Sequence, residues 1–280
     1  MLNIAHRGAR SLAPENTLAA ARKAYELGSD MWELDVNVTA DGELIVFHDG
    51  TLDRVSDAEE VFPGRGPWST HSFTLAELKR LDLGKTFNER DPFGQIAAGA
   101  VSTEERLAWR GEKIPTLREA LAYTRANSWR VNIEIKTLPS SLAHFPITEQ
   151  VVNLIQELDM VEQVIISSFY DNYLQEAKRL SQAVDTAVLR GAGFNGDALS
   201  LVRQLESKIY HPFYMLTNEA EIKVLRQSGI EVNVWTVNRE IDLEHFMQSE
   251  VSGIMTDFPQ TLKAIQSARD DNENEGHREH

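Results

Sequence analysis

Two carboxylates lie two residues apart in an otherwise apolar run, Trp32-Glu33-Leu34-Asp35-Val36. If this run is a β-strand, Glu33 and Asp35 point to one face and the apolar side chains point to the other. Two acids on a covered face are costly to bury unless a positive charge lies between them, and a hard divalent cation meets that need. The alternative is an exposed edge strand whose two acids are solvated.

A second polar face occurs in Asn132-Ile133-Glu134-Ile135-Lys136. Asn132, Glu134 and Lys136 share one side of the expected strand. If this strand is the neighbour of the first, Glu134 can reach the same cation as a third ligand, and Lys136 can point at a phosphate oxygen. Ligation by oxygen alone selects one Mg²⁺ or Ca²⁺ ion over Zn²⁺. A ladder of salt bridges without a metal is the alternative.

Two histidines follow expected strands: His6 at the end of the first, and His48 at the end of a returning hairpin strand. Imidazoles titrate near neutral pH, so a pair can supply an acid and a base. Hydrolysis of a phosphodiester needs both, one to activate the nucleophile and one to protonate the leaving alkoxide. Arg7 offers a planar fork suited to phosphate, and Gly8 permits a sharp turn. A lone histidine at a strand end is more often structural, so this hypothesis requires that both converge on the acids.

Several nearby residues have two interpretations. Glu15 and Asn16 either contact the metal site or cap the first helix, and the cap is favoured. Trp235, at the end of an expected strand, either packs against a bound substrate or is a core or rim aromatic. His211 and Asp257 also fall at strand ends, and we expect them to make rim and secondary contacts rather than to do chemistry.

The elements that must position these residues alternate between short β-type runs and amphipathic helical runs. The expected strands are 2–6, 32–39, 130–136, 164–168, 186–190, 208–211, 231–236 and 253–256. The expected helices are 16–27, 115–126, 172–180, 197–205, 218–227, 240–247 and 259–268. Asp41-Gly42 predicts a hairpin turn, after which 43–48 returns antiparallel. Eight strands alternating with helices favour a closed (β/α)8 TIM barrel of the α/β class, with an open doubly wound sheet as the alternative.

One segment interrupts this alternation. Residues 50–113 are too many for an ordinary connection between a strand and a helix, and they predict a small inserted subdomain above the barrel mouth, after the second barrel strand. The acidic stretch 270–280 lacks apolar periodicity, and we expect a disordered tail there. The expected organisation is therefore a barrel domain over 1–269 with one insert, followed by the tail.

The composition limits the possible partners. A net charge of −15 and a pI of about 5.0 argue against binding to nucleic acid or anionic lipid, so an anionic substrate needs local positive charge from a metal ion, Arg or Lys. Neither a membrane-spanning run nor a signal peptide is expected, which makes cytoplasmic residence the default. The sequence has no cysteine, which excludes disulfides and thiolate metal sites. A monomer or a homodimer is expected.

The ordered motifs resemble the glycerophosphodiester phosphodiesterase family over nearly the whole chain. The matching residues are His6-Arg7-Gly8, Pro14-Glu15-Asn16-Thr17, Glu33-Leu34-Asp35-Val36, Thr39-Ala40-Asp41-Gly42, His48-Asp49, Glu134-Ile135-Lys136 and, more weakly, Leu81-Asp82-Leu83-Gly84, Pro115-Thr116-Leu117, Ser167-Ser168-Phe169, Val234-Trp235-Thr236-Val237-Asn238 and Thr256-Asp257. The resemblance implies a (β/α)8 barrel with a small insertion. It also implies cleavage of glycerophosphodiesters such as glycerophosphocholine, glycerophosphoethanolamine and glycerophosphoglycerol to sn-glycerol 3-phosphate and an alcohol.

The resemblance implies a role for each main residue: acid–base catalysis (His6, His48), phosphate binding (Arg7, Lys136) and binding of the divalent ion (Glu33, Asp35, Glu134). Two other functions compete. A related barrel enzyme acting as a lysophospholipase D or on phosphoinositide-type lipids would need an apolar surface at the mouth, for which the insert offers Val61, Phe62, Trp68, Phe73 and Phe93. A non-catalytic phosphate-binding barrel would be expected to carry a broken histidine or carboxylate set, and this sequence does not.

Overall fold

Eight parallel strands close into a barrel in the computed structural model, which describes residues 1–276 and the side chains of residues 1–270. The barrel strands are β1 (Leu2–Ala5), β2 (Met31–Val38), β4 (Arg130–Ile135), β5 (Val164–Ser168), β6 (Asp185–Arg190), β7 (Ile209–Pro212), β8 (Glu231–Val234) and β9 (Gly253–Thr256). Their order around the barrel is β1-β9-β8-β7-β6-β5-β4-β2, and pairing of β1 with β2 completes the circle. The closed barrel is confirmed, and the open sheet is not found.

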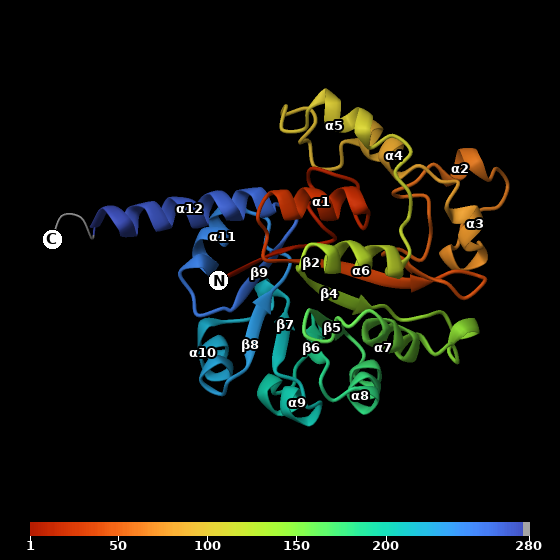
Figure 1. Cartoon of the computed structure of the whole chain (residues 1–280). Coiled ribbons are helices and arrows are strands. Elements are labelled where there is room, and N and C mark those ends of the chain that lie inside the picture. The colour runs from red at the N-terminus through yellow and green to blue at the C-terminus, as the bar shows by residue number, and fades with distance from the viewer. Residues whose placement is uncertain (277–280) are drawn as a thin grey trace.

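A helix follows each barrel strand and covers the outside of the sheet (Figure 1). These helices are α1 (Leu18–Glu26), α6 (Leu117–Ala126), α7 (Ile147–Glu157), α8 (Asp171–Leu180), α9 (Ala198–Gln204), α10 (Glu219–Gln227), α11 (Glu240–Met247) and α12 (Pro259–Gly276). No helix was expected between residues 136 and 164, where α7 lies. Ile147, Val151 and Ile155 are buried at a spacing of four residues, and this helical pattern could have predicted α7.

The last helix is longer than predicted. Residues 270–280 were expected to form a disordered tail, but α12 continues to Gly276 and extends beyond the barrel in Figure 1. Adding a residue to an existing helix costs far less than starting one, so a polar segment can continue a helix whose first turns are packed. The remainder of the predicted tail, residues 277–280, lies outside the described residues.

The predicted hairpin is present, and it redirects the chain after β2. Strand β3 (Leu44–Val46) pairs antiparallel with the last residues of β2, after a turn in which Gly42 has a φ of +83°. β1 pairs with β2 only at Met31 and Trp32, so β3 occupies the edge of β2 that β1 leaves open. Because β3 runs back along β2, the residues after it return to the middle of that strand.

Residues 50–113 hold the short helices η1 (Thr70–Ser72), α2 (Ala58–Val61), α3 (Leu75–Leu78), α4 (Leu83–Arg90) and α5 (Thr103–Ala108), on the side of the barrel that carries α1 and α6 (Figure 1). Phe62 and Phe73 are buried in an apolar cluster with Phe47, and Val61 and Trp68 pack against it. Four of the five residues considered for a lipid groove are therefore used within this cluster. Two further short helices are η2 (Ser140–Leu142) and η3 (Tyr214–Leu216). No helix in residues 1–276 is long and apolar enough to cross a membrane.

Candidate active site

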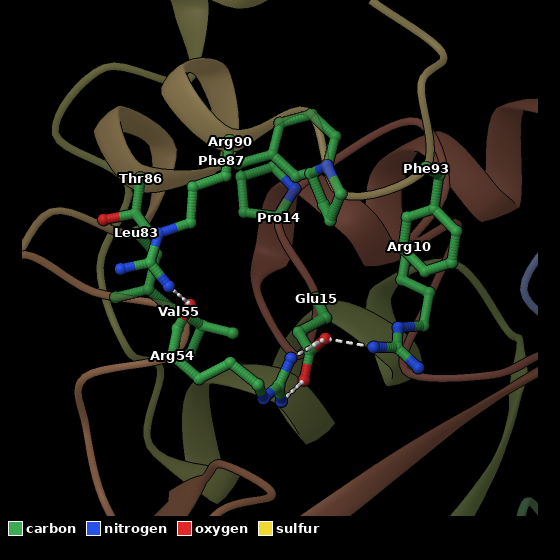
Figure 2. Close-up of a pocket in the computed structure, with 11 residues that line it drawn as sticks. Arg10, Pro14, Glu15, Arg54, Val55, Leu83, Thr86, Phe87, Arg90 and Phe93 are labelled. Carbon is green, nitrogen blue, oxygen red and sulfur yellow. Dashed lines mark hydrogen bonds and ion pairs between the residues drawn. The ribbon is translucent and has the colours of Figure 1, made fainter.

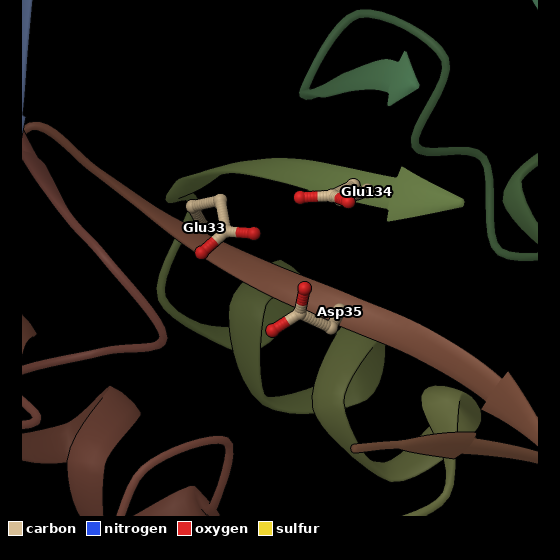
Figure 3. Close-up of side chains that lie close together, drawn as sticks. All are labelled: Glu33, Asp35 and Glu134. Atoms are coloured by element: carbon tan, nitrogen blue, oxygen red, sulfur yellow. The ribbon is translucent and has the colours of Figure 1, made fainter. Parts of the chain in front are cut away.

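The three predicted acids converge. Glu33 and Asp35 lie on β2 and Glu134 lies on the adjacent β4, where Asp35 and Glu134 are partners in the strand pairing. Each offers one oxygen, and these oxygens lie within 4.8 Å of one another (Figure 3). Glu33 and Asp35 are almost fully buried, and the side chain of Glu134 is 13% exposed. The alternative of an exposed edge strand with solvated acids is therefore wrong.

The pKa shifts in this acidic triad (Glu33, Asp35 and Glu134) indicate that the triad lacks a positive charge between its carboxylates. Burial, together with the charges of the other two acids, raises the pKa of Glu33 well above its usual range. Burial and Asp35 raise the pKa of Glu134. Burial also acts to raise the pKa of Asp35, but the positive charge of Arg7 and the other groups around it lower that pKa. Among the described residues, one Asp35 oxygen, Oδ1, accepts no hydrogen bond. These three buried carboxylates fit a hard divalent cation, which would relieve their repulsion.

Arg7 and Lys136 supply positive charge at the edge of the triad. Arg7 Nε lies 3.2 Å from Asp35, its backbone N–H donates to Glu33 at 2.9 Å, and Lys136 Nζ lies 2.9 Å from Glu134. The turn that delivers Arg7 is tight: Arg7 and Gly8 have φ values of 55° and 78°. A Cβ on Gly8 would lie 2.6 Å from the backbone of Ala20, so only glycine fits there.

His6 follows β1 and lies against the triad. Its Nε2 is 4.0 Å from Glu33, and its Nδ1 donates to Asp257 at 2.6 Å. Asn238 also donates to Asp257, at 2.7 Å. Burial acts to raise the pKa of Asp257, but His6, Arg10 and the hydrogen bonds lower it to about 2, so the carboxylate is ionised and holds the imidazole. The predicted secondary contact of Asp257 is thus confirmed.

His48 reaches the same place by a different route. The backbone N–H of Phe47 donates to the carbonyl of Asp35 at 2.9 Å, which holds the chain after β3 against the middle of β2. His48 Nδ1 then donates to Asp49 at 2.6 Å. In both histidines a carboxylate accepts from Nδ1, which leaves Nε2 as the atom available to a bound molecule.

One cavity of about 270 Å³ brings these groups together. Its polar lining residues include His6, Arg7, Glu33, His48, Asn132, Glu134 and Lys136. The other lining residues are Phe169, Leu189, Trp235, Thr236 and Met255. Trp235 is therefore a wall of the cavity, with its ring 5.5 Å from that of Phe169 and its indole N–H donating to the carbonyl of His211 at 2.8 Å.

The favoured interpretation of Glu15 and Asn16 as helix caps is wrong. Thr17 caps α1, because its side chain accepts the N–H of Ala20. Asn16 instead donates to Asp35 at 2.9 Å, and Glu15 accepts from Arg7 at 2.9 Å. Asn16 can face β2 because its backbone has a positive φ of 56°. Asn16 thus contacts a member of the triad, and Glu15 contacts Arg7, which lies against the triad.

Four further residues of the site were not assigned from the sequence: Asp49, Asn132, Arg10 and Arg54. Asp49 directly follows His48, and Asn132 shares a strand face with Glu134, so both had a local signal. Arg10 and Arg54 contact Glu15, but they come from different loops, and nothing local to either residue indicates that contact.

His211 is fully buried inside the barrel rather than at its rim, and it predicts a pH effect on stability. Burial lowers its pKa to about 3 from 6.5. Asn233 donates to its Nε2 at 3.1 Å, and Nδ1 has no hydrogen-bond partner within the described part of the chain. Because the folded pKa is the lower one, the unfolded chain binds the proton first, and the free energy of unfolding decreases as the pH falls from 6.5 toward 3.

This decrease amounts to about 2 kcal/mol between pH 6.5 and about pH 5. We expect His211→Gln to remove it, which urea unfolding of both proteins at the two pH values will measure. The same pH slope in the variant and the wild type would contradict the assignment.

Comparison with known proteins agrees with this geometry. The family model described as the glycerophosphoryl diester phosphodiesterase family matches residues 6–261. A glycerophosphodiester phosphodiesterase of Caldanaerobacter subterraneus subsp. tengcongensis is 35% identical over 262 residues, covering 93% of this chain and 96% of the relative. One from Bacillus subtilis is 30% identical, covering 95% and 86%.

Solved structures show the same fold. A glycerophosphodiester phosphodiesterase from Agrobacterium tumefaciens superposes with a TM-score of 0.72 at 26% identity, covering 93% of this chain and 98% of the other. A phosphodiesterase from Oleispira antarctica, solved with the product sn-glycerol-3-phosphate, gives a TM-score of 0.74 at 24% identity, covering 94% and 96%. The chain belongs to the glycerophosphoryl diester phosphodiesterase family, and it is an enzyme of that class, a phosphoric diester hydrolase.

Proposed function

We propose that this enzyme uses one divalent cation and two histidines to hydrolyse glycerophosphodiesters to sn-glycerol 3-phosphate and an alcohol. The substrates would be glycerophosphocholine, glycerophosphoethanolamine or glycerophosphoglycerol. The observation that carries the proposal is one cavity lined by Glu33, Glu134, Arg7, Lys136 and both imidazoles, with Asp35 within 4.8 Å of the other two acids. The Oleispira antarctica phosphodiesterase, which shares this fold, binds sn-glycerol-3-phosphate, one of the products proposed here.

Glu33, Asp35 and Glu134 are the residues that would hold the cation, Mg²⁺ or Ca²⁺. Support comes from their all-oxygen donor set, their short mutual distances and the pKa of Glu33 and Glu134, which burial and then the neighbouring acids raise. When bound, such an ion neutralises phosphate oxygens and polarises the phosphorus.

Arg7 and Lys136 would bind the non-bridging phosphate oxygens. Both are cations that line the cavity beside Glu33 and Glu134. The guanidinium of Arg7 offers directional N–H donors to a phosphate, and Lys136 adds a second positive charge. Their positive charge would favour the transition state, in which negative charge on phosphorus oxygens is greatest.

His6 and His48 would carry out the proton transfers of the reaction, one as base and the other as acid. One Nε2 removes a proton from the nucleophile, which is water or the 2-hydroxyl of the substrate glycerol, and the other protonates the departing alkoxide. If the 2-hydroxyl attacks, the first product is a cyclic phosphate, and water then opens it to glycerol 3-phosphate with the two imidazoles in exchanged roles. Asp257 and Asp49 support this because each accepts from Nδ1, which fixes the ring and leaves Nε2 for the bound substrate. The two histidines reach the cavity from different segments, one after β1 and one after β3.

The test is release of glycerol 3-phosphate from glycerophosphocholine by the purified enzyme, followed with a coupled dehydrogenase. We expect activity with added Mg²⁺ or Ca²⁺, and loss of activity in a chelator that the metal reverses. Activity that persists unchanged in the chelator would contradict the metal-dependent mechanism, and no release from any of the three diesters would contradict the substrate class.

A further inference from the structure

Glu15 lies at the centre of a group of ion pairs behind the catalytic cavity. Its carboxylate accepts hydrogen bonds from Arg7 at 2.9 Å, from Arg54 at 3.0 Å and from Arg10. The Glu15 side chain is only 8% exposed. Figure 2 shows Arg10 and Arg54 reaching Glu15 from opposite sides at the edge of a second cavity, of about 290 Å³.

The two outer arginines continue to the carboxylates that hold the histidines. Arg10 lies 3.4 Å from Asp257, and Arg54 donates to Asp49 through Nη2 at 3.2 Å and also through Nε. A continuous path therefore joins the Nδ1 atoms of the two imidazoles. In order, its members are His6, Asp257, Arg10, Glu15, Arg54, Asp49 and His48.

The carboxylates and guanidinium groups of this path are ionised, and the hydrogen bonds between them have preferred directions. Burial acts to raise the pKa of Glu15, but a hydrogen bond from Arg54 and the charges of Arg10 and Arg7 lower it well below its usual range, so Glu15 is ionised. Hydrogen bonds between ionised groups are about twice as strong as neutral ones, and a guanidinium donates in fixed directions. Glu15 has no part in capping α1, because Thr17 does this.

We propose that Glu15 is a positioning residue that orients both catalytic imidazoles at once, with Arg10 and Arg54 as its two connections. The proposal rests on the acid–base roles proposed above for His6 and His48. It also gives residues 50–113 a part in the site, because Arg54 comes from that segment. Glu15 does not itself line the catalytic cavity and contacts none of the three proposed metal ligands, so it would act through the arginines it binds, which include the proposed phosphate ligand Arg7.

Glu15→Gln tests this with little change in shape. We expect kcat for glycerophosphocholine to fall about 10- to 100-fold, as supporting contacts typically do, while the lost contact to Arg7, the proposed phosphate ligand, would show separately as a rise in KM. Glu105→Gln is the matched control, because Glu105 also pairs with a cation, Lys23 of α1, but lies outside both cavities. The control should keep the wild-type kcat, and thermal unfolding will show that both variants fold.

A double-mutant cycle separates positioning from a general structural effect. Arg54→Ala should lower kcat in the wild type but cost much less in Glu15→Gln, because the connection is already broken. Wild-type kcat in Glu15→Gln, or equal losses from Arg54→Ala in both backgrounds, would overturn the proposal.

If Glu15→Gln does not fold, the variants Arg10→Ala and Arg54→Ala, alone and combined, provide the test, since both arginines bind Glu15. Non-additive losses would support the proposal and additive losses would overturn it. A wild-type enzyme that releases no glycerol 3-phosphate would instead defeat the proposed function.

Discussion

His6→Ala and His48→Ala are each expected to lower kcat for glycerophosphocholine by about 10²- to 10⁴-fold, the usual contribution of a positioned acid or base. Each imidazole has Nδ1 held by a carboxylate and lines the same cavity as Glu33 and Glu134. Neither is a metal ligand in our proposal, so both variants should still bind the cation. Steady-state kinetics with saturating Mg²⁺ or Ca²⁺ will measure the loss.

The leaving group can tell the two histidines apart. A p-nitrophenyl phosphodiester releases a phenolate that needs no proton, so loss of the general acid should matter much less with this substrate than with glycerophosphocholine. Loss of the general base should lower both rates alike. His144→Ala, at an exposed histidine away from the cavity, is the control. Near wild-type turnover of glycerophosphocholine by either site variant would refute its role.

The acidic triad should give the second large effect. Glu33→Gln, Asp35→Asn and Glu134→Gln are expected to abolish most activity, because a cation and its charge stabilisation are worth several kcal/mol in such reactions. Relative to the wild type, Glu33→Gln should be more stable without metal and less stable with it. In the metal-free protein, Glu33→Gln should raise Tm, since it removes one of three repelling buried carboxylates.

Metal should then raise the Tm of the wild type but not of the variant. Saturating a site at 100 times its Kd stabilises a protein by about 2.7 kcal/mol. Differential scanning calorimetry with and without Mg²⁺ or Ca²⁺ will measure both effects, with the exposed Glu149→Gln as the control. Equal metal-induced shifts in the wild type and Glu33→Gln would show that the ion binds elsewhere.

Much of this architecture could be predicted from local sequence signals. Strands β1 and β2 and the hairpin were recognisable because alternation of apolar and polar residues has a fixed period and Asp-Gly marks the turn. The same alternation placed Glu33 and Asp35 on one face, and strand order then brought Glu134 beside them. Helix α7 was not predicted, although the four-residue spacing of its buried apolar residues indicates a helix.

The supporting contacts were harder to predict because they join distant parts of the chain. Asp257 lies 251 residues from His6, and Arg54 lies 39 residues from Glu15. Which oxygen a guanidinium chooses depends on loop geometry that no sequence period encodes. Glu15 also lies shortly before a helix, where capping is a common role; from the sequence Asn16 and Thr17 are both plausible caps, and the structure shows that Thr17 is the cap.

The hairpin that carries His48 links catalysis to the packing of the apolar core. β3 is not one of the eight strands that close the barrel, but Leu44, Ile45 and Val46 are all buried in apolar clusters. One of the two proposed proton carriers is therefore held in place by core packing. A cavity-forming substitution in β3 should lower turnover as well as stability.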